Sequence, residues 1–128
     1  MPVAHGIFYW NELMTRDVEG AKAFYGAALG WTFAPMPMPD GTYWLVMASG
    51  EAPVAGLFDI HMMDDPQMQP HWMSYIAVDD VDARLEAAVG AGGSILRPPF
   101  DVEGVGRIAI VRDPEGAVTG WMTPVEPA

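Results

Sequence analysis

One pattern occurs twice in the sequence, and this repeat limits the chain to folds built from two similar halves. Residues 17–30 read DVEGAKAFYGAALG and residues 80–93 read DVDARLEAAVGAGG, an offset of 63 residues. Aspartate accepts hydrogen bonds from the free amides of a first helical turn, and glycine suits the position after the last turn. With apolar residues spaced along one face of each segment, the pattern predicts two amphipathic helices, near residues 17–29 and 80–91.

The segments that follow the helices are also similar. PVAGLF (53–58) corresponds to AVTGWM (117–122), with the glycines 64 residues apart, and the segments before them, 42–48 and 106–112, match at the same offset. Each half therefore reads as strand, helix, strand, strand, strand. We expect strands in the first half near 4–13, 31–35, 42–49 and 53–60, and in the second half near 71–78, 94–97, 105–112 and 117–124.

The two halves predict one α+β domain, residues 1–128. It would consist of two βαβββ modules, about 1–60 and 70–128, because a half of this length buries too little surface to be stable alone. Proline and aspartate interrupt the periodicity in residues 59–70, which we expect to form the joining loop. We expect a second irregular stretch at residues 35–41, PMPMPDG.

Charge and composition exclude several classes of function. The chain of 128 residues has a net charge of −11, so it repels nucleic acids and anionic membrane surfaces, while a cationic small molecule would be attracted. The acidity can also serve solubility alone. The absence of cysteine rules out disulfides and thiolate catalysis. No apolar run is long enough to span a membrane, and no secretion signal opens the sequence, so we expect a soluble, cytoplasmic protein.

The duplicated pattern resembles the vicinal oxygen chelate superfamily, which includes glyoxalase I, the bleomycin-resistance proteins and the extradiol dioxygenases. The resemblance rests on DVEGAKAFYGAALGW (17–31), VDDVDA (78–83), GGSILRPPF (92–100) and DPEG (113–116). It is nearest to a glyoxalase-like branch whose members are often described as hydroxylases. It implies two half-barrel sheets with helices on the convex side and a cup for the ligand on the concave side. It also implies a homodimer.

In metal-dependent members, His, Glu or Gln side chains occupy up to four cup positions, two on the first strands and two on the last strands of the modules. Carried over by the distance to the helix-capping aspartate, these positions fall at Trp10, Gly56, Met73 and Gly120. None has a side chain suited to a hard or borderline cation. A register error of one residue would instead offer Tyr9 or Asn11, and Trp72 or Ser74. We expect no cofactor on this basis.

Alternation along the strands predicts which residues line the cup. We expect Ile108 and Ile110 to face a helix, which would place Arg107, Ala109 and Val111 in the cup, and the same reasoning places Tyr43, Leu45 and Met47 there. With the first strand of each module and the two glycines, the predicted ligand-binding residues are Phe8, Trp10, Glu12, Tyr43, Met47, Gly56, His71, Met73, Tyr75, Arg107 and Gly120.

The catalytic residues are left open, with Glu12, His71, Tyr75 and Arg107 as candidates. Each also has an explanation without catalysis. Glu12 would be a strand-end carboxylate in water, and His71 a histidine at the mouth of the loop. Tyr75 would be an aromatic core residue, and Arg107 an arginine in a rim ion pair. Glu12 and His71 together could bind a divalent metal. The repeat places them at different depths, however, and two ligands make a weak site, so a metal is disfavoured.

Two functions compete at this point. The first is metal-free binding of a small aromatic or amphiphilic molecule in an apolar cup, as in bleomycin-resistance proteins. The alternative is a lyase, isomerase or hydroxylase-type enzyme, with or without metal assistance, that acts on a small carbonyl compound. Whether the chain is an enzyme stays undecided, because one fold hosts many chemistries.

Overall fold

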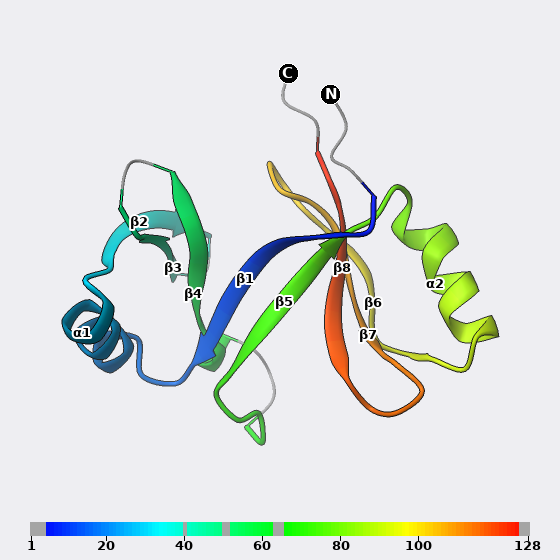
Figure 1. Cartoon of the computed structure of the whole chain (residues 1–128), viewed down its shortest axis with the longest axis horizontal. Helices are drawn as coiled ribbons and strands as arrows, with labels where there is room; N and C mark the ends of the chain where they lie inside the picture. The colour runs from blue at the N-terminus through cyan, green and yellow to red at the C-terminus, as the bar shows by residue number, and fades with distance from the viewer. Residues whose placement is uncertain (1–4, 40, 50–51, 63–65, 126–128) are drawn as a thin grey trace. The chain divides into compact units, whose positions relative to one another are not determined.

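The chain folds into two βαβββ modules in tandem, which confirms the predicted α+β class (Figure 1). The computed structural model describes residues 5–39, 41–49, 52–62 and 66–125. Residues 63–65 of the predicted joining loop, residue 4 of the first predicted strand and Asp40 of the predicted irregular stretch lie outside these ranges. The elements are β1 (Ile7–Thr15), α1 (Val18–Leu29), β2 (Thr32–Met38), β3 (Gly41–Met47), β4 (Pro53–Asp59), a 3-10 turn (Ile60–Met62), β5 (His71–Ala77), α2 (Val81–Gly90), β6 (Ser94–Val102), β7 (Gly106–Arg112) and β8 (Val118–Pro124).

Two compact units divide the chain at slightly different places from the sequence repeat. Residues Trp10–Met73 form the N-terminal unit, and the residues up to Tyr9 join those from Ser74 onward in the C-terminal unit. His5 and Gly6 are each hydrogen-bonded within this second unit. The Gly6 amide donates to the Ala77 carbonyl at 2.7 Å, and the Asp79 amide donates to His5 Nδ1 at 3.0 Å.

Both units have the same strand order and pairing. In the N-terminal unit the order is β2-β3-β4-β1, with antiparallel pairs except for the parallel β1–β4 pair, which places Glu12 opposite Gly56. In the C-terminal unit the order is β5-β8-β7-β6, and the parallel β5–β8 pair places Tyr75 opposite Gly120. Glu12 and Gly56 of the N-terminal unit therefore occupy the same positions in the fold as Tyr75 and Gly120 of the C-terminal unit.

The predicted helix caps are present. The Asp17 carboxylate accepts from the Gly20 amide at 2.9 Å, and α1 ends at Gly30, whose φ of 74° is left-handed. The Asp80 carboxylate accepts from the Ala83 amide at 3.2 Å. The end of α2 differs from the prediction, because Gly92 rather than Gly93 takes the positive φ, at 99°.

Each helix packs on one face of its own sheet. In the N-terminal unit, Ala21 and Tyr25 of α1 pack against a cluster formed by Leu13, Val46, Ala55 and Leu57. In the C-terminal unit, the buried cluster contains Val81 and Leu85 of α2 together with Val78, Ala109 and Val111. Val89 of α2 lies outside this cluster and is 51% exposed.

The expected irregular stretch at residues 35–41 is wrong, because β2 continues to Met38 and β3 begins at Gly41. Pro35 and Pro37 belong to β2, where they lie opposite Trp44 and Thr42 of β3. A strand at the end of the sheet order tolerates proline when the missing amide would point away from its partner. β6 also extends past the predicted end at residue 97, to Val102, and its Pro98 and Pro99 fall in the register shift between Arg97 and Phe100.

Within the described residues, neither helix has the length and apolar character needed to cross a membrane.

Candidate functional site

The face of each sheet that its helix leaves uncovered, called here the open face, carries most of the predicted site residues. In the N-terminal unit, Leu13, Val46 and Leu57 point toward α1. Because side chains alternate along a strand, their neighbours point to the opposite side. The open face of this unit is therefore formed by Trp10, Glu12 and Met14 of β1, Tyr43, Leu45 and Met47 of β3, and Gly56 and Phe58 of β4.

A chain of hydrogen bonds forms the polar centre of this open face. The Tyr43 hydroxyl donates to Glu12 Oε2 at 2.6 Å and accepts from the Trp10 indole N–H at 3.0 Å. Glu12 is only 9% exposed. A buried carboxylate is costly unless it is hydrogen-bonded, so Tyr43 and Glu12 hold each other in place. The structure thus brings together three predicted site residues from two strands.

Gly56 lies directly beneath the Tyr43 ring. A Cβ atom added to Gly56 would overlap the hydroxyl end of that ring. Phe58, two residues further along β4, lies 6.5 Å from Tyr43 between ring centroids. The glycine is therefore required by the tyrosine, whose hydroxyl fills the space into which a side chain at position 56 would extend.

The C-terminal unit repeats this arrangement with different residues. Tyr75, 8% exposed, lies opposite Gly120, and a Cβ atom at Gly120 would overlap the edge of the tyrosine ring. The strand partners of the open face are apolar. Ile108 of β7 lies opposite Met122 of β8, and Ile110 lies opposite Gly120.

The predicted orientation of β7 is wrong. Ala109 and Val111 pack against α2, so Arg107 lies on the helix side of the strand and Ile108 and Ile110 lie on the open face. The prediction places Ile108 and Ile110 under the helix as core residues, and the assumed repeat offset does not expose the error. Gly56 pairs with Leu45 and Gly120 pairs with Ile110, so the third strands correspond at 65 residues and not at the assumed 64. A slip of one residue reverses every side chain of a strand.

Arg107 is consequently paired with carboxylates on the helix side, not with Glu12. Its guanidinium donates to both oxygens of Asp82, at 2.8 and 3.2 Å, and to Asp101 at 3.0 Å. The hydrogen bond from Arg107 lowers the pKa of Asp82, and the two carboxylates raise the pKa of Arg107. This is the rim ion pair that was the plain alternative for this residue.

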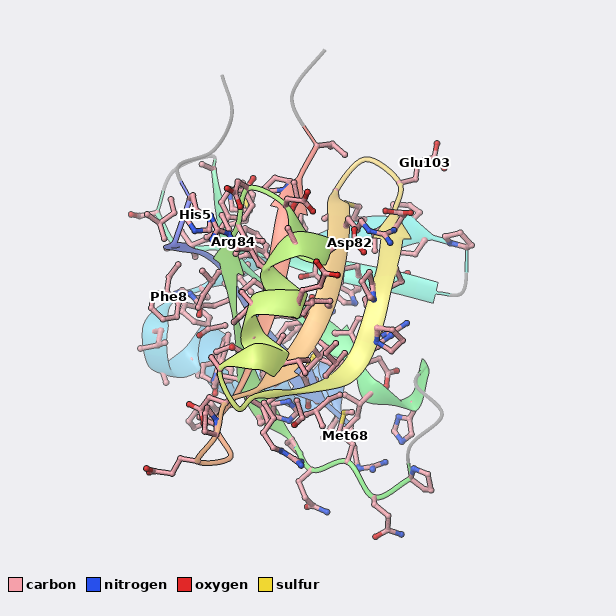
Figure 2. All side chains as sticks on the ribbon, turned by 90° about the vertical axis from the view of Figure 1, so that its right-hand side faces the viewer. His5, Phe8, Met68, Asp82, Arg84 and Glu103 are labelled. Atoms are coloured by element: carbon pink, nitrogen blue, oxygen red, sulfur yellow. The ribbon has the colours of Figure 1, made fainter. Side chains whose placement is uncertain are left out.

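The remaining predicted site residues lie in varied surroundings. His71 is half-buried, and its Nδ1 lies 2.7 Å from the Gln69 carbonyl in the preceding loop. Met73 is 7% exposed, and Met47 is half-buried beside a register shift between β3 and β4. Phe8, labelled in Figure 2, is 69% exposed and belongs to the part of β1 that packs with the C-terminal unit.

The four positions that the family resemblance assigns to metal ligands do not fit a divalent cation. Trp10 and Met73 offer an indole and a thioether, and Gly56 and Gly120 offer no side chain. The structure also shows that a tyrosine ring fills the space beside each glycine: Tyr43 beside Gly56 and Tyr75 beside Gly120. In the part of the chain that the structure describes, no three His, Asp or Glu side chains converge on a point where a metal could bind.

Sequence reasoning missed several open-face residues: Met14, Phe58, Ile108, Ile110 and Met122. The two glycines were the signal that could have found them. Aligning Gly56 with Gly120 gives the alternation of β4 and β8, whereas the orientation of β7 depends on its pairing with β8.

Comparison with known proteins gives a family match and curated relatives. The model of the family described as the Glyoxalase/Bleomycin resistance protein/Dioxygenase superfamily matches residues 7–119. A protein described as "Putative glyoxylase CFP32", in Mycobacterium bovis and Mycobacterium tuberculosis, is 39% identical over 119 residues, 93% of this chain and 44% of that protein. The anthracycline biosynthesis protein DnrV of Streptomyces peucetius is 32% identical over 126 residues, 89% of this chain and 46% of that protein. The chain spans less than half the length of these relatives.

Solved structures share the fold at low identity. The methylmalonyl-CoA epimerase from Mycobacterium tuberculosis aligns with a TM-score of 0.63 at 17% identity, covering 98% of this chain and 94% of that chain. A Streptomyces coelicolor methylmalonyl-CoA epimerase in complex with 2-nitronate-propionyl-CoA aligns with a TM-score of 0.66 at 17% identity, covering 98% of this chain and 100% of that chain. At this identity the likeness concerns the fold alone.

Proposed function

The chain belongs to the glyoxalase/bleomycin resistance protein/dioxygenase superfamily, and on that premise we propose that it binds a small, largely apolar molecule without the superfamily metal. The ligand is aromatic or amphiphilic, and it lies on the open face of the N-terminal sheet. Most of that face is apolar, with Trp10, Leu45, Met47 and Phe58 surrounding one polar centre. Apolar walls with few, well-placed polar groups are typical of small-molecule sites.

The single observation that supports metal-free binding is the contact between Tyr43 and Gly56. In a metal-dependent member, the last strand of the module would contribute a ligating side chain at this position. Here the position has no side chain, and the tyrosine hydroxyl fills the space beside it. That hydroxyl is bound to Glu12 and Trp10, so it is held in place. A metal at this position would have neither a side-chain donor from residue 56 nor room for one.

A metal analysis and a ligand screen together test this proposal. Protein purified without chelators should contain no stoichiometric divalent metal by mass spectrometry. A thermal-shift screen of aromatic and amphiphilic compounds should give hits, because a ligand that binds only the native state raises its stability. The shift of each hit should survive EDTA. One divalent ion per chain, tightly held and needed for the shift, would overturn the proposal.

Two variants test whether a hit binds at the proposed face. Tyr43→Phe removes the hydroxyl that links Trp10 to Glu12 in the polar centre, and should reduce the ligand-induced shift. Tyr9→Phe removes a tyrosine hydroxyl that is not part of this hydrogen-bonded chain, and should leave the shift unchanged. Equal shifts in the wild type and both variants would exclude the N-terminal open face as the binding site.

The burial and hydrogen bonding of Glu12 support a second candidate function, proton transfer. It is a buried carboxylate on an otherwise apolar face, and it accepts a short hydrogen bond from Tyr43. Such a group is suited to act as a general base on a carbonyl compound. A carbonyl-containing hit incubated in D2O should then exchange the hydrogen next to its carbonyl, and Glu12→Gln should abolish the exchange. Binding without exchange or product over a long incubation would leave the binding function alone.

We also propose a cytoplasmic homodimer formed by a single domain of two modules. Light scattering coupled to size exclusion should give the mass of two chains. Cooperative unfolding, with one transition for tryptophan fluorescence and circular dichroism, should show the modules unfolding together. The mass of one chain, or two separate transitions, would contradict these expectations.

A further inference from the structure

A groove lies on the helix side of the C-terminal unit, between α2 and β6. Its volume is about 760 Å³, and one side is formed by α2 and the other by Ile95 and Pro99 of β6. Asp82, labelled in Figure 2, lies on the flank of α2 in this groove. Within this unit, α2 covers the sheet face opposite to Tyr75 and Gly120, so the groove is separate from the open face.

The floor and rim of the groove are apolar. Leu85 forms the floor and is 4% exposed, while Val89 on the rim is 51% exposed and Ile95 across the groove is 40% exposed. Leu85 and Val89 are four residues apart, so they lie on one side of the helix. Exposed apolar side chains on two facing elements form a surface on which an apolar group could be buried.

The charge of the groove has a single sign. Its lining contains Asp80, Asp82 and Glu86 but no lysine or arginine. Two of the three carboxylates already have partners, because Asp80 caps α2 and Asp82 is held by Arg107. Arg107 also binds Asp101 of β6, so this ion pair connects the helix to the strand. Glu86 takes part in no ion pair that the described residues make, and its side chain faces solvent.

We propose that this groove binds an amphiphilic organic cation, with its ammonium group beside Glu86 and its apolar body over Leu85, Val89 and Ile95. The volume fits a small molecule. Arg107 neutralises Asp82, so the uncompensated charge of the groove comes mainly from Glu86, and the net charge of −11 draws cations toward the protein. This site is independent of the ligand site proposed on the N-terminal open face.

The probe is hexyltrimethylammonium chloride, titrated into ¹⁵N-labelled full-length protein at low salt. Amide shifts should concentrate in residues 82–89 and 94–97, the segments that border the groove. Two probes of similar apolar length, hexanol and hexanoate, should bind more weakly because they lack the positive charge. Shifts elsewhere with none in these segments, or equal binding of hexanol, would overturn the proposal.

A matched pair of variants separates the local charge from the overall charge. Glu86→Gln should weaken probe binding about two- to fivefold, the scale of an exposed ion pair. Glu103→Gln removes the same charge from an exposed turn outside the groove, labelled in Figure 2, and should leave binding nearly unchanged. Equal weakening by both variants would show that only net charge matters, and would overturn the site.

A third variant tests the apolar contact. Val89→Ser replaces an exposed valine on the rim, so the fold should be kept, and the amide spectrum of the free variant verifies this. Binding of hexyltrimethylammonium should weaken by a similar factor, while tetramethylammonium, which lacks the apolar body, should bind the variant and the wild type alike. Unchanged binding of the hexyl probe to Val89→Ser would contradict the proposed orientation.

Discussion

Tyr75 lies directly opposite Gly120 across the parallel β5–β8 pair, and its ring occupies the space that any larger residue at position 120 would need. The Tyr43 ring likewise fills the space beside Gly56 in the other unit, although the residue of β3 that pairs with Gly56 is Leu45. The two contacts come from different strands, since Tyr43 belongs to β3 and Tyr75 to β5. The two modules therefore use tyrosines from different strands to cover equivalent glycines.

Gly120→Ala and Gly56→Ala should each lower the free energy of unfolding by about 1–3 kcal/mol, because the added methyl group overlaps a packed ring. Gly90→Ala is the matched control. Gly90 is the last residue of α2, and an added Cβ atom there meets nothing within 4 Å. This substitution should be neutral or should stabilise the protein by up to about 1 kcal/mol. Urea unfolding of the three variants measures the difference, and equal effects would contradict the glycine contacts.

Tyr43→Phe should lower the free energy of unfolding by about 1–3 kcal/mol, because Glu12 and the Trp10 indole lose a hydrogen bond in a half-buried setting. Tyr9→Phe, at an exposed tyrosine, should change stability by less than about 0.5 kcal/mol. Urea midpoints of the two variants decide this. A Tyr43→Phe variant as stable as the wild type would mean that the hydroxyl is not needed to hold Glu12.

Asp17→Ala should lower the free energy of unfolding by about 1 kcal/mol, since the Gly20 amide loses its acceptor at the start of α1. Asp17→Ser is the control, because serine also accepts hydrogen bonds at this position and should recover most of the loss. The helix has no fully buried residue, so its cap should be visible in overall stability. If alanine and serine behave alike, the cap does not stabilise α1.

The stability of the protein should fall in acid partly through Asp79. The hydrogen bond from Arg84 lowers the pKa of Asp79 from 3.8 to about 2 in the folded chain. A depressed folded pKa gives a contribution that is present above the unfolded pKa and is lost as the pH falls from about 4 to 2. The stability difference between the wild type and Asp79→Asn should therefore shrink over that range. NMR titration of the Asp79 carboxyl carbon checks the pKa directly, and a midpoint near 4 would contradict it.

Local signals in the sequence were enough to predict both helices. Asp17 and Asp80 stand at the caps where their chemistry places them, and Gly30 ends α1 with a positive φ. Glu12 and Tyr43 were also predicted to share a face and are hydrogen-bonded, although alternation alone left the choice of face open for β3. These features depend on neighbours within one turn or one strand, which a single sequence contains.

The orientation of β7 could not be read in this way. Ala109 and Val111 are apolar as well as Ile108 and Ile110, so hydrophobic periodicity does not show which face of β7 lies under α2. Only the pairing of Ile110 with Gly120 determines the register, and that pairing joins different strands. The extent of β2 was missed for a related reason. Proline argues against a strand unless the strand is known to lie at the edge.

The prolines of β2 affect whether a strand from another copy of this protein can pair with it. Pro35 and Pro37 are spaced so that both point their ring nitrogens the same way, and they pair with β3 without donating to it. A foreign strand that approached the outer side of β2 would find no amide hydrogen at either position. Backbone-templated polymerisation is thereby disfavoured at this border, which protects a chain rich in apolar strands from amyloid-like growth.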